Sequence, residues 1–91
     1  MEQSKIVRYI QELSRKEQDK FHQFVLSPYF NQHKKTTALL EIILEKPKVL
    51  AQRKRLFGSL FPGETFEEQK LHNLFSYLKK LYVKFLSYQH L

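Results

Sequence analysis

The chain has 91 residues, of which 42% are hydrophobic and 27% are charged, and it contains no cysteine. This length suits one domain that buries about 65% of the surface of its unfolded chain, and the composition excludes a disordered tail, a membrane protein and any disulfide or thiolate chemistry. Sixteen basic residues against nine acidic residues give a formal net charge of +7, and the basic excess is largest in the middle of the chain.

The few glycines and prolines separate segments whose apolar residues recur with the period of a helix, which predicts an all-α fold. The expected domain is a small bundle of about five helices with a long C-terminal helix. The predicted helices cover approximately residues 4–13, 15–26, 32–46, 51–61 and 66–90.

The first two helices are separated by a helix-start signal. Ile6 and Ile10 lie on one face of the first helix. Ser14 and Glu17 have the spacing of a capping box, in which hydroxyl and carboxylate each accept a hydrogen bond from a free amide of the first turn. The second helix is therefore expected to begin at this point and, because of Pro28, to end near Leu26.

The segment that follows combines aromatic residues with a central helix. Tyr29 and Phe30 are interpreted as anchors that pin the connection onto the core, and Asn31 is a candidate cap for the next helix. The segment 32–46 is apolar around most of its circumference in its second half, which is typical of a central, buried helix. Pro47 ends it.

The two glycines of the chain lie inside the fourth predicted helix and in the turn that follows it. Gly58 weakens the predicted helix 51–61 by about 1 kcal/mol relative to alanine. Either a close helix crossing or simple tolerance explains its presence. Pro62 and Gly63 are a strong signal for a turn that ends the segment.

The last helix has the widest apolar face. Thr65 and Glu68 repeat the capping-box spacing, and the apolar residues that follow cover an arc of roughly 180°, more than the 100° needed for packing on one side. At 1.5 Å per residue the helix is about 39 Å long, against about 30 Å for a compact domain of this size. The residues expected to overhang the domain are Phe85, Leu86, Tyr88 and Leu91.

This broad face predicts a protein-protein interaction or assembly module without enzymatic activity. The expected partner is the remainder of a longer parent chain, another protein or a second copy, and the chain is expected to be one helical domain, 1–91, at the N-terminus of a longer helical protein. A frayed terminus that folds back is the alternative interpretation of the overhang. The predicted partner-binding residues are Tyr77, Leu81, Phe85 and Tyr88.

The sequence offers little for chemistry. No two of its four histidines have the i, i+4 spacing that presents a metal on one helix. Neither a glycine-rich phosphate loop, nor a nucleophile elbow, nor a carboxylate pair on an apolar background is present. We therefore expect no catalytic site, cofactor, metal or membrane association. Without a secretory signal, the expected location is the cytoplasm.

Nucleic-acid binding is the alternative function. The second and third helices, with the turn between them, are compatible with a helix-turn-helix, and the basic residues nearby suit phosphates and base edges. Against it, the turn lacks the glycine-containing sequence common in this motif, and a solvated basic loop accounts for the same residues. The residues predicted for this alternative are Asn31, Gln32, Lys34, Lys35, Arg53, Lys54 and Arg55.

The chain also resembles the N-terminal segment of an uncharacterised bacterial protein family. The resemblance spans most of residues 10–88, and its most distinctive stretches are Ser-Pro-Tyr-Phe-Asn at 27–31 and Leu-Phe-Pro-Gly at 60–63. Leu13-Ser14, Phe24 and the apolar stripe of the last helix contribute to it as well. In that family the segment precedes a longer, largely helical region. The resemblance implies no activity, because both stretches have turn and anchor chemistry.

Overall fold

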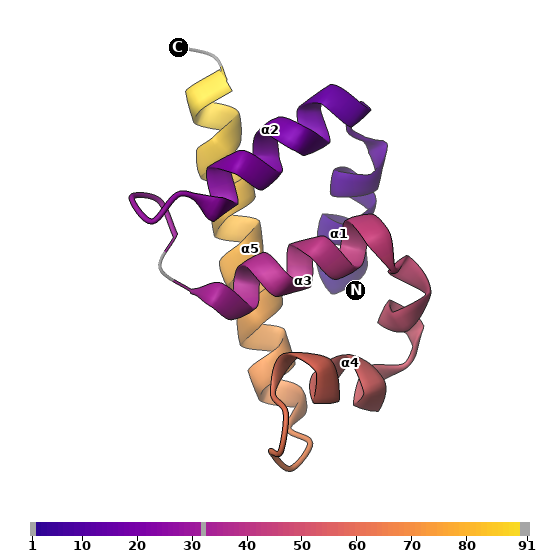
Figure 1. The fold of residues 1–91 in the computed structure, drawn as a ribbon. Coiled ribbons are helices and arrows are strands. Elements are labelled where there is room, and N and C mark those ends of the chain that lie inside the picture. The colour runs from indigo at the N-terminus through magenta and orange to yellow at the C-terminus, as the bar shows by residue number, and fades with distance from the viewer. Residues whose placement is uncertain (1, 32, 90–91) are drawn as a thin grey trace.

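The computed structural model describes residues 2–31 and 33–89 and confirms the all-α prediction. Within these residues there are five α-helices, one 3-10 helix and no strand (Figure 1). The elements are α1 (Glu2–Glu12), α2 (Arg15–Leu26), α3 (Lys34–Glu45), the 3-10 helix η1 (Pro47–Ala51), α4 (Arg53–Leu60) and α5 (Glu68–Gln89).

The elbow between α1 and α2 is built by the predicted capping box. The backbone amide of Ser14 donates to Glu17 Oε1 at 3.0 Å, and the amide of Glu17 donates to Ser14 Oγ at 3.1 Å. Gln18 Nε2 donates to the carbonyl of Ile10 at 3.0 Å, which ties the start of α2 to the end of α1. The prediction was correct here because all the groups are local in sequence.

The capping box makes part of the stability pH-dependent. The hydrogen bond from the Ser14 amide, followed by the contact with its hydroxyl, lowers the pKa of Glu17 from the ordinary 4.5. A lowered pKa in the folded state means that the stabilisation is present above the unfolded pKa and is lost as the pH falls through the folded pKa.

We expect Glu17→Gln, which keeps an acceptor but removes the charge, to be less stable than the wild type at neutral pH. The difference should shrink as the pH falls through the pKa that Glu17 has in the folded domain, because the wild-type carboxylate is then protonated as well. Urea unfolding across a series of pH values from neutral to acidic measures it. A difference that stays constant between neutral and acidic pH would show that the charge of Glu17 is not involved.

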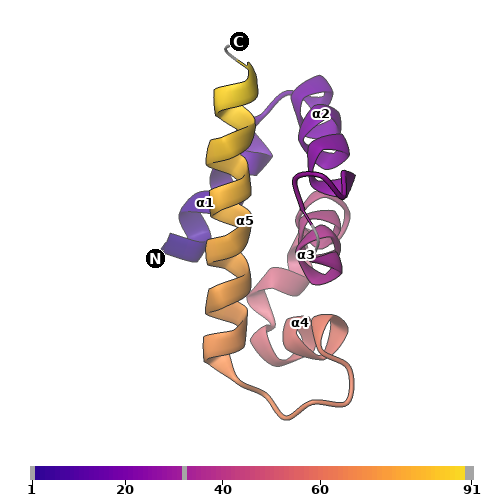
Figure 2. The ribbon, with the colours of Figure 1, turned by 90° about the vertical axis from the view of Figure 1, so that its left-hand side faces the viewer.

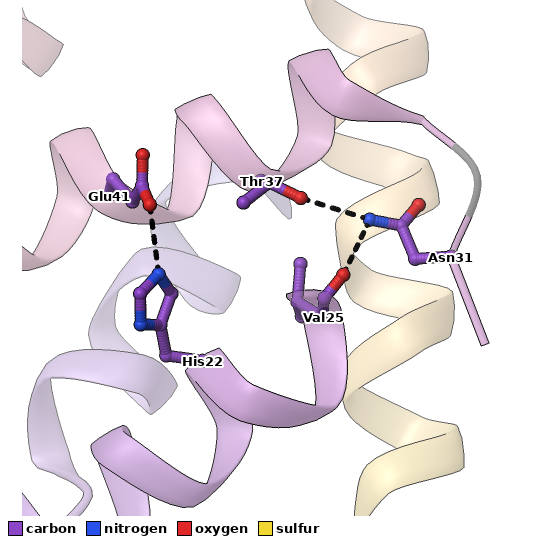
Figure 3. Close-up of polar contacts among 5 residues, drawn as sticks. All are labelled: His22, Val25, Asn31, Thr37 and Glu41. Atoms are coloured by element: carbon purple, nitrogen blue, oxygen red, sulfur yellow. Dashed lines mark hydrogen bonds and ion pairs between the residues drawn. The ribbon is translucent and has the colours of Figure 1, made fainter. Parts of the chain in front are cut away.

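Helices α2 and α3 form an antiparallel hairpin. Figures 1 and 2 show them side by side, running in opposite directions, joined by the segment 27–33. His22 Nε2 and Glu41 Oε2, 2.9 Å apart, link the two helices along their length (Figure 3). A helix-turn-helix instead has two helices at about 90–120° joined by a turn of about 3–4 residues. Helices α2 and α3 therefore do not have the geometry of a helix-turn-helix, in contrast to the prediction.

Helix α5 runs along the length of the molecule, and α2, α3 and α4 lie one below another beside it (Figure 2). Helix α1 contacts both α5 and α3, and α3 touches every other helical element, as its apolar circumference predicted. The core residues come from all five α-helices and the turn after α4. They are Ile6, Ile10, Phe21, Val25, Leu39, Leu40, Ile43, Leu56, Phe57, Leu60, Phe61, Leu71, Leu74, Phe75, Leu78, Leu81 and Phe85.

The length prediction for α5 was wrong in two respects. The helix begins at Glu68, so Thr65 lies outside it and is not the N-cap of a capping box. Its 22 residues span about 33 Å, and the domain measures 42 × 25 × 21 Å. The domain is elongated, so most of α5 lies within its length. Phe85 is buried, Leu86 and Tyr88 are partly exposed, and Leu91 lies outside the described residues.

The two glycines have different roles. Gly58 is exposed in α4, and a Cβ at this position would meet nothing within 4 Å. No close helix crossing therefore requires glycine here, and the helix simply tolerates it. Gly63 has φ +80° and follows Pro62 in a turn closed by the amide of Glu64 and the carbonyl of Phe61 at 3.2 Å. A type II turn requires this positive φ.

We therefore expect Gly58→Ala to stabilise the domain by about 0.5–1 kcal/mol, because alanine restricts the unfolded chain and favours the helix. Gly63→Ala should destabilise it by about 1–2 kcal/mol, because a Cβ is strained at positive φ. Urea unfolding of both variants measures the pair. Equal effects of the same sign would contradict the roles assigned to the two glycines.

Candidate partner-binding groove

Aromatic side chains from three parts of the chain form a groove between α2 and the C-terminal end of α5. Phe24 stacks on Phe30, with ring centroids 4.3 Å apart and planes 21° apart. Tyr88 meets the edge of Phe30 at 5.0 Å and lies 5.9 Å from Phe24. The floor is completed by Phe85, whose centroid is 5.6 Å from that of Phe24. We call this site the aromatic groove; its volume is about 600 Å³.

The rim of the aromatic groove is polar and mostly basic. Lys16 and Lys20 are exposed one turn apart on α2. Asp19 lies between them in sequence, and its carboxylate pairs with Arg15 at 3.5 Å. Gln23 and Ser27 continue the rim toward the connection. Among the residues that line the groove, the charge along this edge is therefore positive on balance.

The four predicted partner-binding residues do not form one surface. Leu81 and Phe85 are each only 4% exposed, because α2 covers this part of α5 and places Phe21 5.0 Å from Phe85. The expectation that these two present a free apolar face was wrong, although Phe85 does contribute to the floor of the aromatic groove. Tyr88 is 49% exposed in that groove. Tyr77 is half-buried at a different place, 4.4 Å from the ring of His33.

The two aromatic residues of the connection also differ from each other. Phe30 is half-buried and acts as the predicted anchor through Phe24 and Tyr88. Tyr29 is 85% exposed and touches only the edge of Phe30 at 4.9 Å, so its interpretation as an anchor was wrong. In this turn, of the two successive rings only that of Phe30 packs against the domain.

Asn31 fixes the connection from inside (Figure 3). Its Nδ2 donates to the carbonyl of Val25 at 2.9 Å and to Thr37 Oγ1 at 3.2 Å, which joins the end of α2 to α3. Its Oδ1 accepts from the amide of His33 at 2.9 Å. Asn31 is only 6% exposed, and the residue before α3 is His33. Asn31 is therefore an internal clamp and neither the cap of α3 nor a surface contact for nucleic acid.

The remaining residues of the nucleic-acid alternative are spread over the domain. Lys34, Lys54 and Arg55 are exposed. Lys35 Nζ donates to the carbonyl of Leu60 at the end of α4, at 2.6 Å. Arg53 pairs with Glu68 and lies over the ring of Phe75, at 6.0 Å. Gln32 lies outside the described residues.

The two basic clusters of that alternative lie at opposite ends of α4. Lys35 reaches Leu60, the last residue of this helix, whereas Arg53 is its first. At 1.5 Å per residue these ends are about 10 Å apart. The fold therefore places the two clusters at the two ends of this short helix.

Sequence patterns identified only part of the aromatic groove. Phe30 was predicted as an anchor, but no local pattern places Phe30 or Phe24 beside Tyr88, which is more than fifty positions later in the chain. Lys16 and Lys20 carried no signal beyond an ordinary surface. Burial of the α5 face by α2 could have been inferred from the apolar stripe of α2, because that stripe needs a partner.

Within residues 2–31 and 33–89, no three acidic or histidine side chains form a group that could hold a metal ion, and no helix has the length and apolar character to cross a membrane. The resemblance noted from the sequence stays an expectation. No family model, curated protein or solved structure matches this chain.

Proposed function

We propose that this chain is a non-enzymatic protein-interaction module that binds an acidic amphipathic helix in the aromatic groove. The observation that carries the proposal is Tyr88, a large ring left 49% exposed at the end of a helix whose other phenylalanine and tyrosine rings are buried or half-buried. It stands over the half-buried Phe24 and Phe30. Tyrosine is among the residues that contribute most to protein interfaces, because it buries a large area with little loss of side-chain freedom.

The charge of the rim supports an acidic partner. Lys16 and Lys20 are separated by about 6 Å along α2, so glutamates one turn apart on a partner helix would face them. The only acidic side chain of the groove, Asp19, is already paired with Arg15. A helix laid between α2 and α5 would then place apolar residues on Tyr88, which is the geometry of helix-in-groove recognition.

The experiment uses a synthetic helical peptide with leucine and phenylalanine at i and i+4 and glutamates on one flank. We expect the wild-type protein to bind it at least about tenfold more tightly than the same peptide with lysines in place of the glutamates. Tyr88→Ser should weaken binding at least about tenfold, as loss of a central aromatic residue does in other interfaces. Fluorescence anisotropy measures the dissociation constants.

Tyr29→Ser is the matched control, because it removes an equally large exposed ring that is not part of the aromatic groove. Its affinity should stay within about twofold of the wild type. Equal weakening by Tyr88→Ser and Tyr29→Ser would contradict the proposal. So would a dimer that forms through Tyr88, detected by sedimentation across protein concentrations, because a second copy would then occupy the groove.

A further inference from the structure

The aromatic groove has two chemically different ends. Its wall on α2 is a single stripe of side chains, spaced three or four residues apart from Lys16 to Ser27. At 1.5 Å per residue this wall is about 16 Å long, which is the length of about three turns of a second helix. A partner helix that lies along α2 therefore meets different side chains at its two ends.

The positive charge lies at the N-terminal end of α2. Lys16 and Lys20 are exposed there, and the carboxylate of Asp19 between them is already paired. Beyond Lys20 the stripe continues with the uncharged side chains of Gln23 and Ser27. The charged part of the groove is therefore confined to the first half of this wall.

The aromatic side chains lie at the opposite end. Phe24 stacks on Phe30 with ring centroids 4.3 Å apart, and the ring of Tyr88 lies 5.9 Å from the first and 5.0 Å from the second. Phe24 is about 12 Å further along α2 than Lys16 and about 6 Å further than Lys20. In Figure 1 the C-terminal half of α2 crosses α5, whereas its N-terminal end lies away from α5. Tyr88 is therefore within reach at one end of the groove only.

This order of side chains sets the spacing of the contact residues on a partner helix. Positions 1, 5, 8 and 12 of a helix lie on one face, within an arc of about 60°. Acidic residues at positions 1 and 5 have the same separation as Lys16 and Lys20. Apolar residues at positions 8 and 12 then lie at the level of Phe24 and Tyr88. The acidic residues of the partner therefore precede or follow its apolar residues and are not spread over the whole helix.

The charge also determines the direction of the partner helix. Glutamates in the first turn of a helix are stabilised by the positive end of its dipole, whereas glutamates in the last turn are destabilised. A helix whose glutamates face Lys16 and Lys20 is therefore more stable if it begins over these residues than if it ends there. The dipole of α2 does not oppose this direction, because the Glu17 carboxylate already accepts from the Ser14 amide at 3.0 Å.

We propose that the partner helix begins over Lys16 and Lys20 with its glutamates, runs parallel to α2, and ends with its apolar residues on Tyr88. This inference rests on the proposed function, because it concerns the occupant of the same groove. It adds the order of acidic and apolar residues in the partner and the direction of its helix.

The first test compares two peptides of about 14 residues, long enough for the three turns of the wall. Both have acetylated and amidated ends, which removes the terminal charges. The forward peptide has glutamate at positions 1 and 5, leucine at 8 and phenylalanine at 12, and the reversed peptide has the same residues in the opposite order. We expect the forward peptide to bind about threefold to tenfold more tightly in fluorescence anisotropy. Equal affinities, or tighter binding of the reversed peptide, would overturn the proposed direction.

A nitroxide label on one end of the forward peptide locates that end directly, whatever the helicity of the free peptide. In NMR spectra of the ¹⁵N-labelled chain, a label at the peptide N-terminus should broaden the amide signals of Lys16 and Lys20 more than those of Ser27 and Tyr88. A label at the peptide C-terminus should have the opposite effect. The reverse pattern, or equal broadening at both ends of the groove, would overturn the inference.

Charge exchange tests the pairing of individual positions. Lys16→Glu should weaken binding of the forward peptide about threefold to tenfold, and lysine at peptide position 1 should restore the affinity for this variant more than for Lys20→Glu. Lys54→Glu is the matched control, because it changes the net charge equally at an exposed position outside the groove. Its affinity should stay within about twofold of the wild type. Equal losses in Lys16→Glu and Lys54→Glu would contradict the pairing.

The outcomes distinguish this inference from the proposed function. If the forward peptide does not bind, or if Tyr88→Ser leaves its affinity unchanged, the groove is not the binding site and both are wrong. If the peptide binds through Tyr88 but its labelled ends are reversed, the proposed function stands and only the direction of the helix is wrong.

Discussion

Replacing Leu78 with aspartate is expected to unfold the domain. Leu78 is 0% exposed in the middle of α5, the helix that contacts α1, α2 and α3. The substitution removes a buried leucine side chain, at a cost of about 2–5 kcal/mol. It also buries a carboxylate without a partner, at a cost of several kcal/mol more. Domains of this size have a total stability of about 5–15 kcal/mol, so most of the margin is lost.

Val83→Asp is the matched control for this variant, because Val83 lies on the same helix and is 55% exposed. Valine and aspartate have similar helix propensities, so stability should change by less than about 1 kcal/mol. Far-UV circular dichroism and urea unfolding of both variants measure the difference. A cooperative, wild-type-like transition for Leu78→Asp would show that this face of α5 does not pack against the core.

Replacing Asn31 with alanine is expected to destabilise the domain by about 2–4 kcal/mol. The substitution removes the donor to the carbonyl of Val25 and to Thr37 Oγ1, and the acceptor for the amide of His33. A buried polar group left without its partner costs about 1–3 kcal/mol, and at least one of these groups has no access to water at the original site. Urea unfolding measures the loss.

The role of each half of the amide can be separated. Asn31→Asp keeps the shape and an acceptor for the amide of His33 but loses the donor to Val25. We expect it to be destabilised by a similar amount at neutral pH. Asn73→Ala, at an exposed position on α5, is the control and should change stability by less than about 0.5 kcal/mol. If Asn31→Asp unfolds like the wild type, the donor of Asn31 does not hold the connection.

The sequence was most informative where the signal was local. The limits of α2 match the predicted 15–26, because the Ser14 capping box and Pro28 act on neighbouring backbone groups. The same pattern at Thr65 failed, since α5 begins only at Glu68. Two residues with capping-box spacing make a cap only if the chain turns into the helix at that point, and here the turn at Gly63 and the packing of Phe66 on Phe57 delay the start.

The aromatic groove depended on contacts between distant parts of the chain, which periodicity does not give. The wide apolar arc of α5 indicated more than one packing surface, but not that α2 would cover Phe85 and leave Tyr88 at the edge.

Asn31 lies between two residues that pack in different places. Phe30, directly before it, belongs to the wall of the aromatic groove, and His33, two residues after it, packs on Tyr77 of α5. One buried side chain therefore supports the chain on both sides of the connection. A mutation at Asn31 would be expected to change the shape of the aromatic groove without replacing any residue that lines it.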